Sequence, residues 1–256
     1  MRSQGSSCAW ALAFVLVTCS VAPLPAEASS SVAKAREALH AWDIGGAQRA
    51  IKKLQARAPG DAITLLLAGH LDLLTGRYER ATKRLTASVE KTPTAYGRHL
   101  RDLAAATWKE TRRYATHRTQ KGNFIIRYPA GVDAVLLPYA DAALEKAYAV
   151  LTPLFGHTPR GPVRVEIYPR VDVLAAVSPL TGREIKTSGT IALCKYNRLM
   201  IVSPRDLVYG YAWADTLAHE FIHLLVTQKS RNRVPVWLHE GLARYYQERW
   251  KGGKTP

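Results

Sequence analysis

The chain is poor in cysteine, and the few cysteines it has are unevenly placed. Of three in total, Cys8 and Cys19 lie within the first 28 residues and only Cys194 lies beyond them. One remaining cysteine excludes an internal disulfide framework for the rest of the chain. Cys194 lies in an apolar run, which favours a small core residue over a nucleophile.

Acidic residues are also scarce relative to basic ones. Twenty Asp and Glu face 36 Lys and Arg, which gives a formal net charge of +16. This balance favours anionic partners, such as acidic substrates or an anionic component of the cell envelope. No basic stretch is interleaved with aromatic residues as in nucleic-acid-binding motifs, so nucleic acid is not an expected partner.

The N-terminal segment has the features of a leader. A positive residue precedes the apolar run Ala9 to Val17, which is too short to span a bilayer comfortably, and Ala26-Glu27-Ala28 follows. This order indicates a signal peptide over residues 1–28 and an exported protein, periplasmic or secreted. Lipidation at Cys19 is less favoured, because the residue before it is atypical of a lipobox, and an uncleaved N-terminal anchor is a further alternative.

Residues 29–115 are rich in helix formers and lack strand-like alternation, so we expect a helical region, with one helix near residues 95–114. A weak repeat of 34 residues relates Ala47, Ile51 and Pro59 to Ala81, Leu85 and Pro93. The order of glycine, aromatic and small residues in 74–81 (LTGRYERA) resembles that of a tetratricopeptide repeat. Small residues let paired helices approach closely, and the proline ends the second helix. A generic array of helical hairpins is the alternative.

The pattern changes after a polar stretch at residues 116–122, which indicates a linker. We expect strands at 123–128, 163–168, 190–194 and 198–202, and helices at 139–155 and 171–177. The segment Lys195-Tyr196-Asn197 joins the last two strands and indicates a hairpin. Ser203 to Asp206 is expected to cap and begin a helix. The predicted fold class is α+β, with a helical array followed by a smaller mixed-sheet domain at residues 123–256.

Residues 212–227 (AWADTLAHEFIHLLVT) predict a strongly apolar helix that carries a metal-binding pattern. His219 and His223 are four apart, so both imidazoles project from one face, where they can share one Zn²⁺. Glu220 is rotated by about 100° from His219, so its carboxylate can reach a catalytic water without being a ligand. A metal offsets the cost of burying these polar groups in an apolar helix.

A catalytic zinc site needs a third protein ligand. The metzincin continuation would require Gly at 226 and His at 229, and this chain has Val226 and Lys229. Glu240 lies downstream on a second predicted helix, at a distance that allows this helix to return alongside the first. His239 is the competing candidate.

The segments 219–223 (HEFIH) and 237–243 (WLHEGLA) resemble the gluzincin group of zinc metallopeptidases, and especially the bacterial peptidase MA-like proteins. Those proteins often follow a signal peptide and are often joined to tetratricopeptide repeats. The resemblance implies a zincin-like domain with His219, His223 and Glu240 as ligands and Glu220 as the catalytic base that activates water for peptide hydrolysis.

The resemblance also implies where the substrate binds and what completes the site. Gly189, Thr190, Ile191 and Ala192 are expected to form an edge strand that pairs with an extended peptide substrate. Gluzincins commonly use a Tyr or His beyond the third ligand to stabilise the oxyanion, and here Tyr245 and Tyr246 follow Glu240. Tyr209 and Tyr211 are the alternatives.

Two other polar residues are candidates for supporting roles. Asp215, one turn before His219, is placed to orient an imidazole, or else is a solvated or capping residue. His239 is expected to support the site from outside the ligand set or to face the substrate. The chain ends at Pro256, whereas peptidase MA-like proteins usually continue with further helices, so we expect a short or truncated catalytic wall.

Two non-enzymatic functions compete with the peptidase. In one, the repeat helices recruit a protein partner and the zinc fold is a catalytically inactive scaffold. An intact Glu220 disfavours this function, because a scaffold needs no base, whereas the short C-terminus favours it. In the other, the charge of +16 binds an anionic polymer of the envelope.

Overall fold

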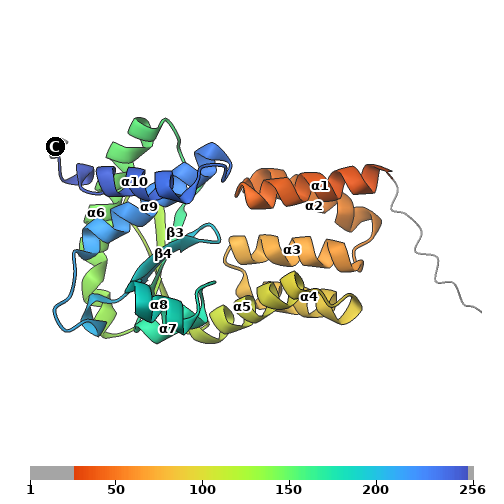
Figure 1. Cartoon of the computed structure of the whole chain (residues 1–256), viewed down its shortest axis with the longest axis horizontal. Coiled ribbons are helices and arrows are strands. Elements are labelled where there is room, and N and C mark those ends of the chain that lie inside the picture. The colour runs from red at the N-terminus through yellow and green to blue at the C-terminus, as the bar shows by residue number, and fades with distance from the viewer. Residues whose placement is uncertain (1–25, 253–256) are drawn as a thin grey trace, which may run out of the picture.

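A computed structural model describes residues 26–252 as helices around one five-stranded mixed sheet, which confirms the α+β class. Figure 1 shows the N-terminal helices stacked at one end of the molecule and the sheet with its covering helices at the other. The predicted signal peptide lies outside the described residues, apart from its last three positions at the start of α1. No helix in residues 26–252 is long and apolar enough to cross a membrane.

The first five helices form the helical region that the sequence predicts. They are α1 (Ala26–His40), α2 (Ile44–Arg57), α3 (Ala62–Leu74), α4 (Tyr78–Lys91) and α5 (Ala95–Thr111). Pro59 and Pro93 each follow a helix by two residues, and the residues before them, Ala58 and Thr92, leave the helical conformation (ψ 74° and 94°). A residue that precedes proline disfavours the helical conformation, so the two prolines end α2 and α4 as predicted.

Side-chain caps begin three of these helices. Asp43 accepts a hydrogen bond from the backbone of Gly46, Asp61 from Ile63 and Thr64, and Thr94 from Gly97. Buried small residues let the helices approach, since Ala47 and Ala81 are fully buried at equivalent positions of α2 and α4.

The sheet contains strands β1 (Ala115–Arg118), β2 (Phe124–Tyr128), β3 (Val163–Tyr168), β4 (Ala192–Lys195) and β5 (Arg198–Val202). Their order is β1-β2-β3-β5-β4, with β2, β3 and β5 parallel and the two edge strands antiparallel to their neighbours. The linker predicted at 116–122 is wrong, because residues 115–118 pair with β2 as an edge strand.

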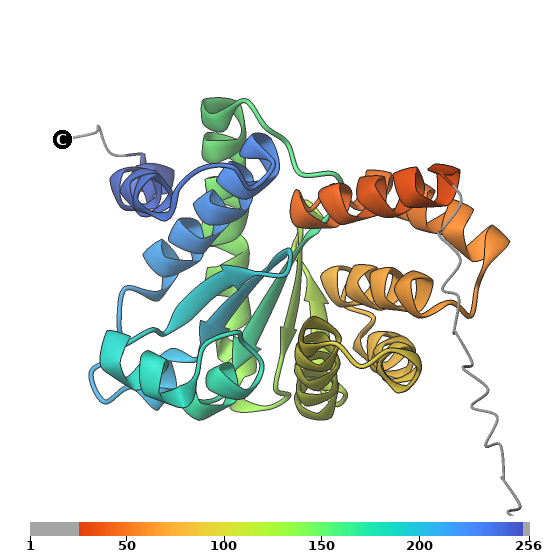
Figure 2. The same ribbon diagram turned by 45° about the vertical axis from the view of Figure 1, so that its right-hand side comes forward.

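The sheet is covered by helices on both faces (Figure 2). They are η1 (Val132–Leu136), α6 (Leu137–Phe155), α7 (Val171–Ala176), α8 (Gly182–Ser188), η2 (Pro204–Asp206), α9 (Trp213–Ser230), α10 (Val236–Tyr246) and η3 (Arg249–Lys251). Helices α6 and α9 share a core with Phe124, Val165 and Ile201, whereas α7 and α8 pack with Tyr168 and Met200 on the other face.

The hairpin of β4 and β5 confirms one local prediction and corrects another. Tyr196 and Asn197 both have positive φ (54° and 56°), as a two-residue type I′ turn requires. The edge strand, however, begins only at Ala192. Gly189 instead ends α8 in the left-handed conformation (φ 64°), and Thr190 bonds back to Ile185.

The helix start predicted at Ser203 is also different in the structure. Residues 204–206 form only one 3-10 turn, and the Ser203 hydroxyl donates to Asp133 on η1 instead of capping it. The Asp206 carboxylate accepts a hydrogen bond from the backbone of Val171. The long helix α9 therefore begins independently, at Trp213.

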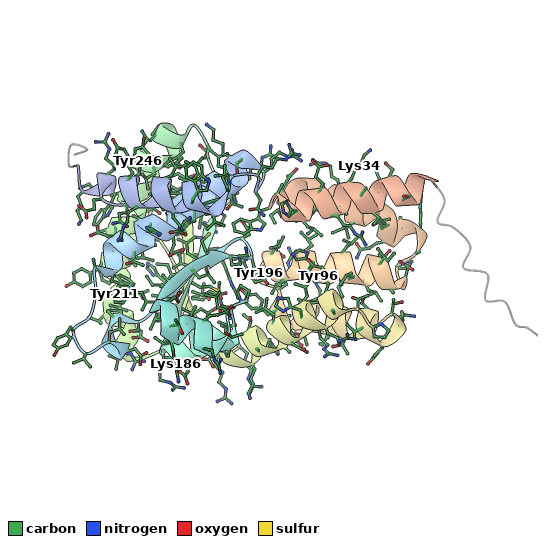
Figure 3. The ribbon with its side chains drawn as sticks, in the orientation of Figure 1. Lys34, Tyr96, Lys186, Tyr196, Tyr211 and Tyr246 are labelled. Carbon is green, nitrogen blue, oxygen red and sulfur yellow. The ribbon has the colours of Figure 1, made fainter. Side chains whose placement is uncertain are left out.

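A buried polar network joins the helical region to the sheet. Arg198 on β5 donates to the Tyr78 hydroxyl on α4 (2.6 Å) and to Glu166 on β3 (2.9 Å), and Tyr78 and Tyr168 also donate to Glu166. All four side chains are essentially inaccessible to solvent. The hairpin residue Tyr196 extends this junction by packing against the helical cores (Figure 3). The two parts of the chain are thus packed into one body.

Candidate metal centre

Helix α9 places its two histidines on the one face that the core leaves open. Phe221, Ile222 and Leu225 are fully buried against the sheet and α6, whereas the side chains of His219 and His223 retain 17% and 13% exposure. Their spacing of four residues puts the rings side by side, and their Nε2 atoms are 3.1 Å apart. The predicted placement on one face is therefore confirmed.

A tight turn brings α10 back against this face. Helix α9 ends where Arg231 and Asn232 adopt the left-handed conformation (φ 56° and 58°), and the backbone of Asn232 donates to Thr227. Helix α10 then carries Glu240 to 3.6 Å from His219 Nε2 and 3.5 Å from His223 Nε2. The structure thus brings together the three ligands that the sequence predicts.

The donor atoms fit a zinc ion. One atom from each of His219, His223 and Glu240 lies within 4.8 Å of the other two. Zn–N and Zn–O bonds of about 2.0–2.1 Å in a tetrahedron place donor atoms about 3.3 Å apart. The separations here, 3.1 to 3.6 Å, match that value. Three protein donors also leave room for a fourth, as in catalytic zinc sites.

Gln247 contacts His219, although it was not among the residues predicted from the sequence. Its Oε1 lies 3.0 Å from Nδ1 of His219, so it can accept the Nδ1 proton and leave Nε2 free for a metal. Gln247 is seven residues after Glu240, which places both on one face of α10. That spacing is the signal that could have identified it.

Glu220 is buried beside the three ligands and is only 6% exposed. Its Oε2 has no hydrogen-bond partner in the described part of the chain. Burial, followed by the charge of Glu240, raises the pKa of Glu220 to about 8, although the backbone of Cys194 opposes the shift. A buried carboxylate oxygen without a hydrogen-bond partner is costly, so its presence calls for an explanation. A metal and a water molecule bound nearby would provide one.

Two of the histidines, His223 and His239, have lowered pKa values. Burial, assisted by His219 and His239, lowers the pKa of His223 to about 3. Burial also lowers the pKa of His239, against the opposing charge of Glu240 and with help from Lys195. Neutral imidazole is the form that binds metals, so at neutral pH His223 need not lose a proton first.

A cleft of about 650 Å³ surrounds the three donors. Strand β4 borders it on one side and α9 and α10 on the other. Gly189, Thr190, Ile191 and Ala192 all line it, although only Ala192 belongs to the strand. Because β4 is the last strand of the sheet, its outer edge faces no other strand.

Of the two residues predicted to have supporting roles, His239 lies in the cleft and Asp215 lies outside it. His239 lines the cleft with its ring centroid 5.7 Å from that of His223, and it does not join the metal-binding group. Asp215 contacts neither imidazole, so its predicted orienting role is wrong. Its carboxylate instead accepts from Trp250 Nε1 (3.0 Å) and Lys251 Nζ (2.6 Å), which ties η3 to α9.

The tyrosines predicted as oxyanion donors lie elsewhere. Tyr246 packs edge-on against Phe155 and Tyr245 is 52% exposed, and neither lines the cleft. Tyr209 is 99% exposed, and the hydroxyl of Tyr211 donates to the Val202 carbonyl (Figure 3). The structure therefore places none of the four at the donor cluster. For Tyr245 and Tyr246 the reason is helix phase, which turns them away from the face that carries Glu240.

Arg244 is a cationic side chain that the structure places in the cleft. It follows Glu240 by one turn of α10 and lines the cleft beside His219 and Gly241. Its spacing of four residues from Glu240 puts the two on the same face. Its guanidinium is available for a developing negative charge.

No family model, curated protein or solved structure matches the chain. The assignment of the site therefore depends on its residues and their geometry.

Proposed function

We propose that this protein is a zinc-dependent peptidase with a zincin-like catalytic domain and a tetratricopeptide-like helical region. The observation that carries the proposal is the convergence of His219, His223 and Glu240 at zinc-binding distances, with the unpartnered carboxylate of Glu220 beside them. A structural zinc site would need a fourth protein ligand and no buried base. The donor set therefore favours a catalytic centre.

The chain's residues divide the chemistry between them. His219, His223 and Glu240 would hold Zn²⁺, and a bound zinc supplies Lewis acidity and lowers the pKa of a water molecule. Glu220 accepts the proton of the attacking water at its Oε2 and returns it to the leaving amine. We assign the stabilisation of the oxyanion to Arg244, which lines the cleft beside His219 and Glu240.

The edge of β4 supports a peptide as the substrate. An edge strand offers unpaired backbone N–H and C=O groups, to which an extended peptide adds as a further strand. Strand β4 borders the same cleft as the donor cluster. A peptide along this edge would pass beside Glu220, and the leader-like segment before residue 29 favours an exported location for this activity.

The direct test is peptide hydrolysis by the zinc-loaded chain. A general peptide library is incubated with the protein, and the products are identified by mass spectrometry. We expect defined cleavage products, their loss when a chelator removes the metal, and their return when zinc is added back. A chain that holds zinc but cleaves no member of the library would contradict the peptidase and support the catalytically inactive scaffold.

A further inference from the structure

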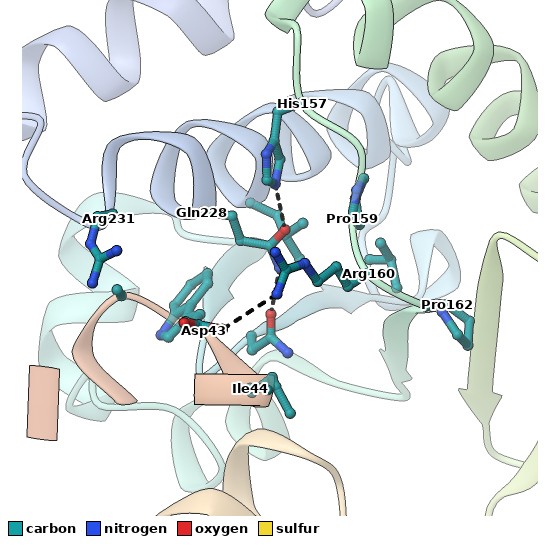
Figure 4. Close-up of a pocket in the computed structure, with 15 residues that line it drawn as sticks. Asp43, Ile44, His157, Pro159, Arg160, Pro162, Gln228 and Arg231 are labelled. Atoms are coloured by element: carbon teal, nitrogen blue, oxygen red, sulfur yellow. Dashed lines mark hydrogen bonds and ion pairs between the residues drawn. The ribbon is translucent and has the colours of Figure 1, made fainter. Parts of the chain in front are cut away.

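A second cavity lies at the junction of the helical region and the sheet. It measures about 230 Å³ and is bordered by the turn between α1 and α2, by the loop before β3 and by the C-terminal part of α9. Figure 4 shows Asp43 and Ile44 on one side of it and His157, Arg160 and Gln228 on the other. His157 bonds Gln228 (3.0 Å), and Asp43 pairs with Arg160 (3.9 Å).

Trp42 borders both this cavity and the cleft that holds the donor cluster. Among the residues that the structure describes, it is the one that lines both spaces. Its side chain is half-buried. It packs against the core of the helical region and also against the core that α6 and α9 form with the sheet. The indole thus forms part of the wall of both hollows, which makes it a candidate partition between them.

The backbone holds Trp42 in an unusual conformation. Its φ is 53°, in the left-handed region that bulky residues rarely adopt. Backbone hydrogen bonds from Asp43 to Ala38 (2.8 Å) and from Ile44 to the Trp42 carbonyl (3.0 Å) fix the turn. A strained position that the surrounding structure maintains is a reason to look for a function.

Ionic and polar contacts also join the C-terminal end of α1, next to Trp42, to the turn that leads into α10. Glu37 on α1 pairs with Arg231 (3.1 Å) and Arg233 (3.6 Å), and His40 contacts Asn232 (3.3 Å). These contacts fix the helical region against the segment that positions Glu240. Trp42 therefore has a defined position relative to the donor cluster.

We propose that Trp42 sets the depth of a substrate subsite for an apolar side chain, an inference that rests on the proposed peptidase function. Val234 and Val236 line the cleft along with Trp42, which gives this part of it apolar walls. On the far side of the indole, Ile44 and Pro159 line the second cavity. The partition admits small and medium apolar side chains and excludes bulky ones, and its removal would let a larger side chain reach into the second cavity.

Truncation of the indole tests the proposal. A peptide cleaved by the wild type is varied at single positions on each side of the scissile bond to Ala, Leu, Phe or Trp. At one position, we expect Trp42→Ala to raise the ratio of kcat/KM for the Trp peptide over the Ala peptide by at least about 10-fold, in line with the selectivity of hydrophobic pockets. Trp42→Phe, which keeps most of the packing, should give a smaller shift in the same direction.

Ile44→Ala is the matched control, because Ile44 lines the second cavity but not the cleft. It should leave the ratio unchanged. Equal ratios in the wild type, Trp42→Ala and Trp42→Phe would overturn the partition while leaving the peptidase intact.

If the wild type cleaves no peptide, the peptidase fails first. Calorimetric binding of short synthetic peptides of one common sequence, which carry Ala, Leu, Phe or Trp at a single central position, to the zinc-loaded chain then decides the partition. We expect the ratio of Kd values to change by a similar factor in Trp42→Ala. An unchanged ratio, or no binding of any member, would overturn it.

Discussion

Glu220→Gln is expected to lower kcat by about 10²- to 10⁴-fold, the usual contribution of a general base. The amide keeps the shape of the side chain but accepts no proton. The amide carries no charge, so its burial costs less than that of the carboxylate, and the variant should fold. Its zinc content should equal that of the wild type, since Glu220 lies outside the group of three donors.

Asp215→Asn is the control for this change. It makes the same carboxylate-to-amide exchange five residues earlier on α9, where the side chain binds Trp250 and Lys251 outside the cleft. Its kcat should stay close to that of the wild type. A Glu220→Gln variant that cleaves peptides at the wild-type rate would remove Glu220 from the mechanism.

Glu166→Gln is expected to destabilise the whole molecule by about 3–5 kcal/mol, as is typical when one partner of a buried ion pair is removed. Arg198 would keep its charge in a fully buried position with its carboxylate partner gone. Because Tyr78 binds the same group from α4, the loss should weaken the packing of the helical region on the sheet. The measurement is the free energy of unfolding from urea denaturation.

The exposed pair of Glu79 and Lys83 supplies the comparison, and Glu79→Gln should change that free energy by no more than about 0.5 kcal/mol. Equal effects of the two substitutions would contradict a structural role for the buried network.

The same network makes the free energy of unfolding depend on pH. Burial alone would raise the pKa of Glu166, but the charges of Arg198 and Arg164 and the hydroxyls of Tyr168 and Tyr78 outweigh it and hold the pKa below its ordinary value. The carboxylate of Glu166 therefore stabilises the folded state at pH values above the ordinary pKa of a glutamate. This contribution to the free energy of unfolding is lost as the pH falls through the lowered pKa of Glu166 in the folded state.

The convergence of the three candidate ligands could be predicted because the information that specifies it is local. His219 and His223 share a helix face through their spacing alone, and Glu240 needed only a return helix of workable length. Contacts between distant segments could not be predicted in this way. Asp215 finds its partners on η3, and Trp42 reaches the cleft from the helical region.

Weak patterns explain the other errors. Strand β1 is an edge strand with half of its residues exposed, so its polar composition resembled that of a linker. Tyr245 and Tyr246 follow Glu240 closely, but a helix turns successive residues by about 100°, which leaves only positions such as Arg244 and Gln247 on the same face.

The most direct test of the account is the zinc stoichiometry of the chain, measured by elemental analysis after dialysis against limiting zinc. The account predicts one zinc per wild-type chain and loss of that zinc in His223→Ala and in Glu240→Ala. His70→Ala, a change of a histidine that contacts Tyr96 in the helical region, should retain it. Equal zinc content in all four proteins would contradict a metal centre at His219, His223 and Glu240.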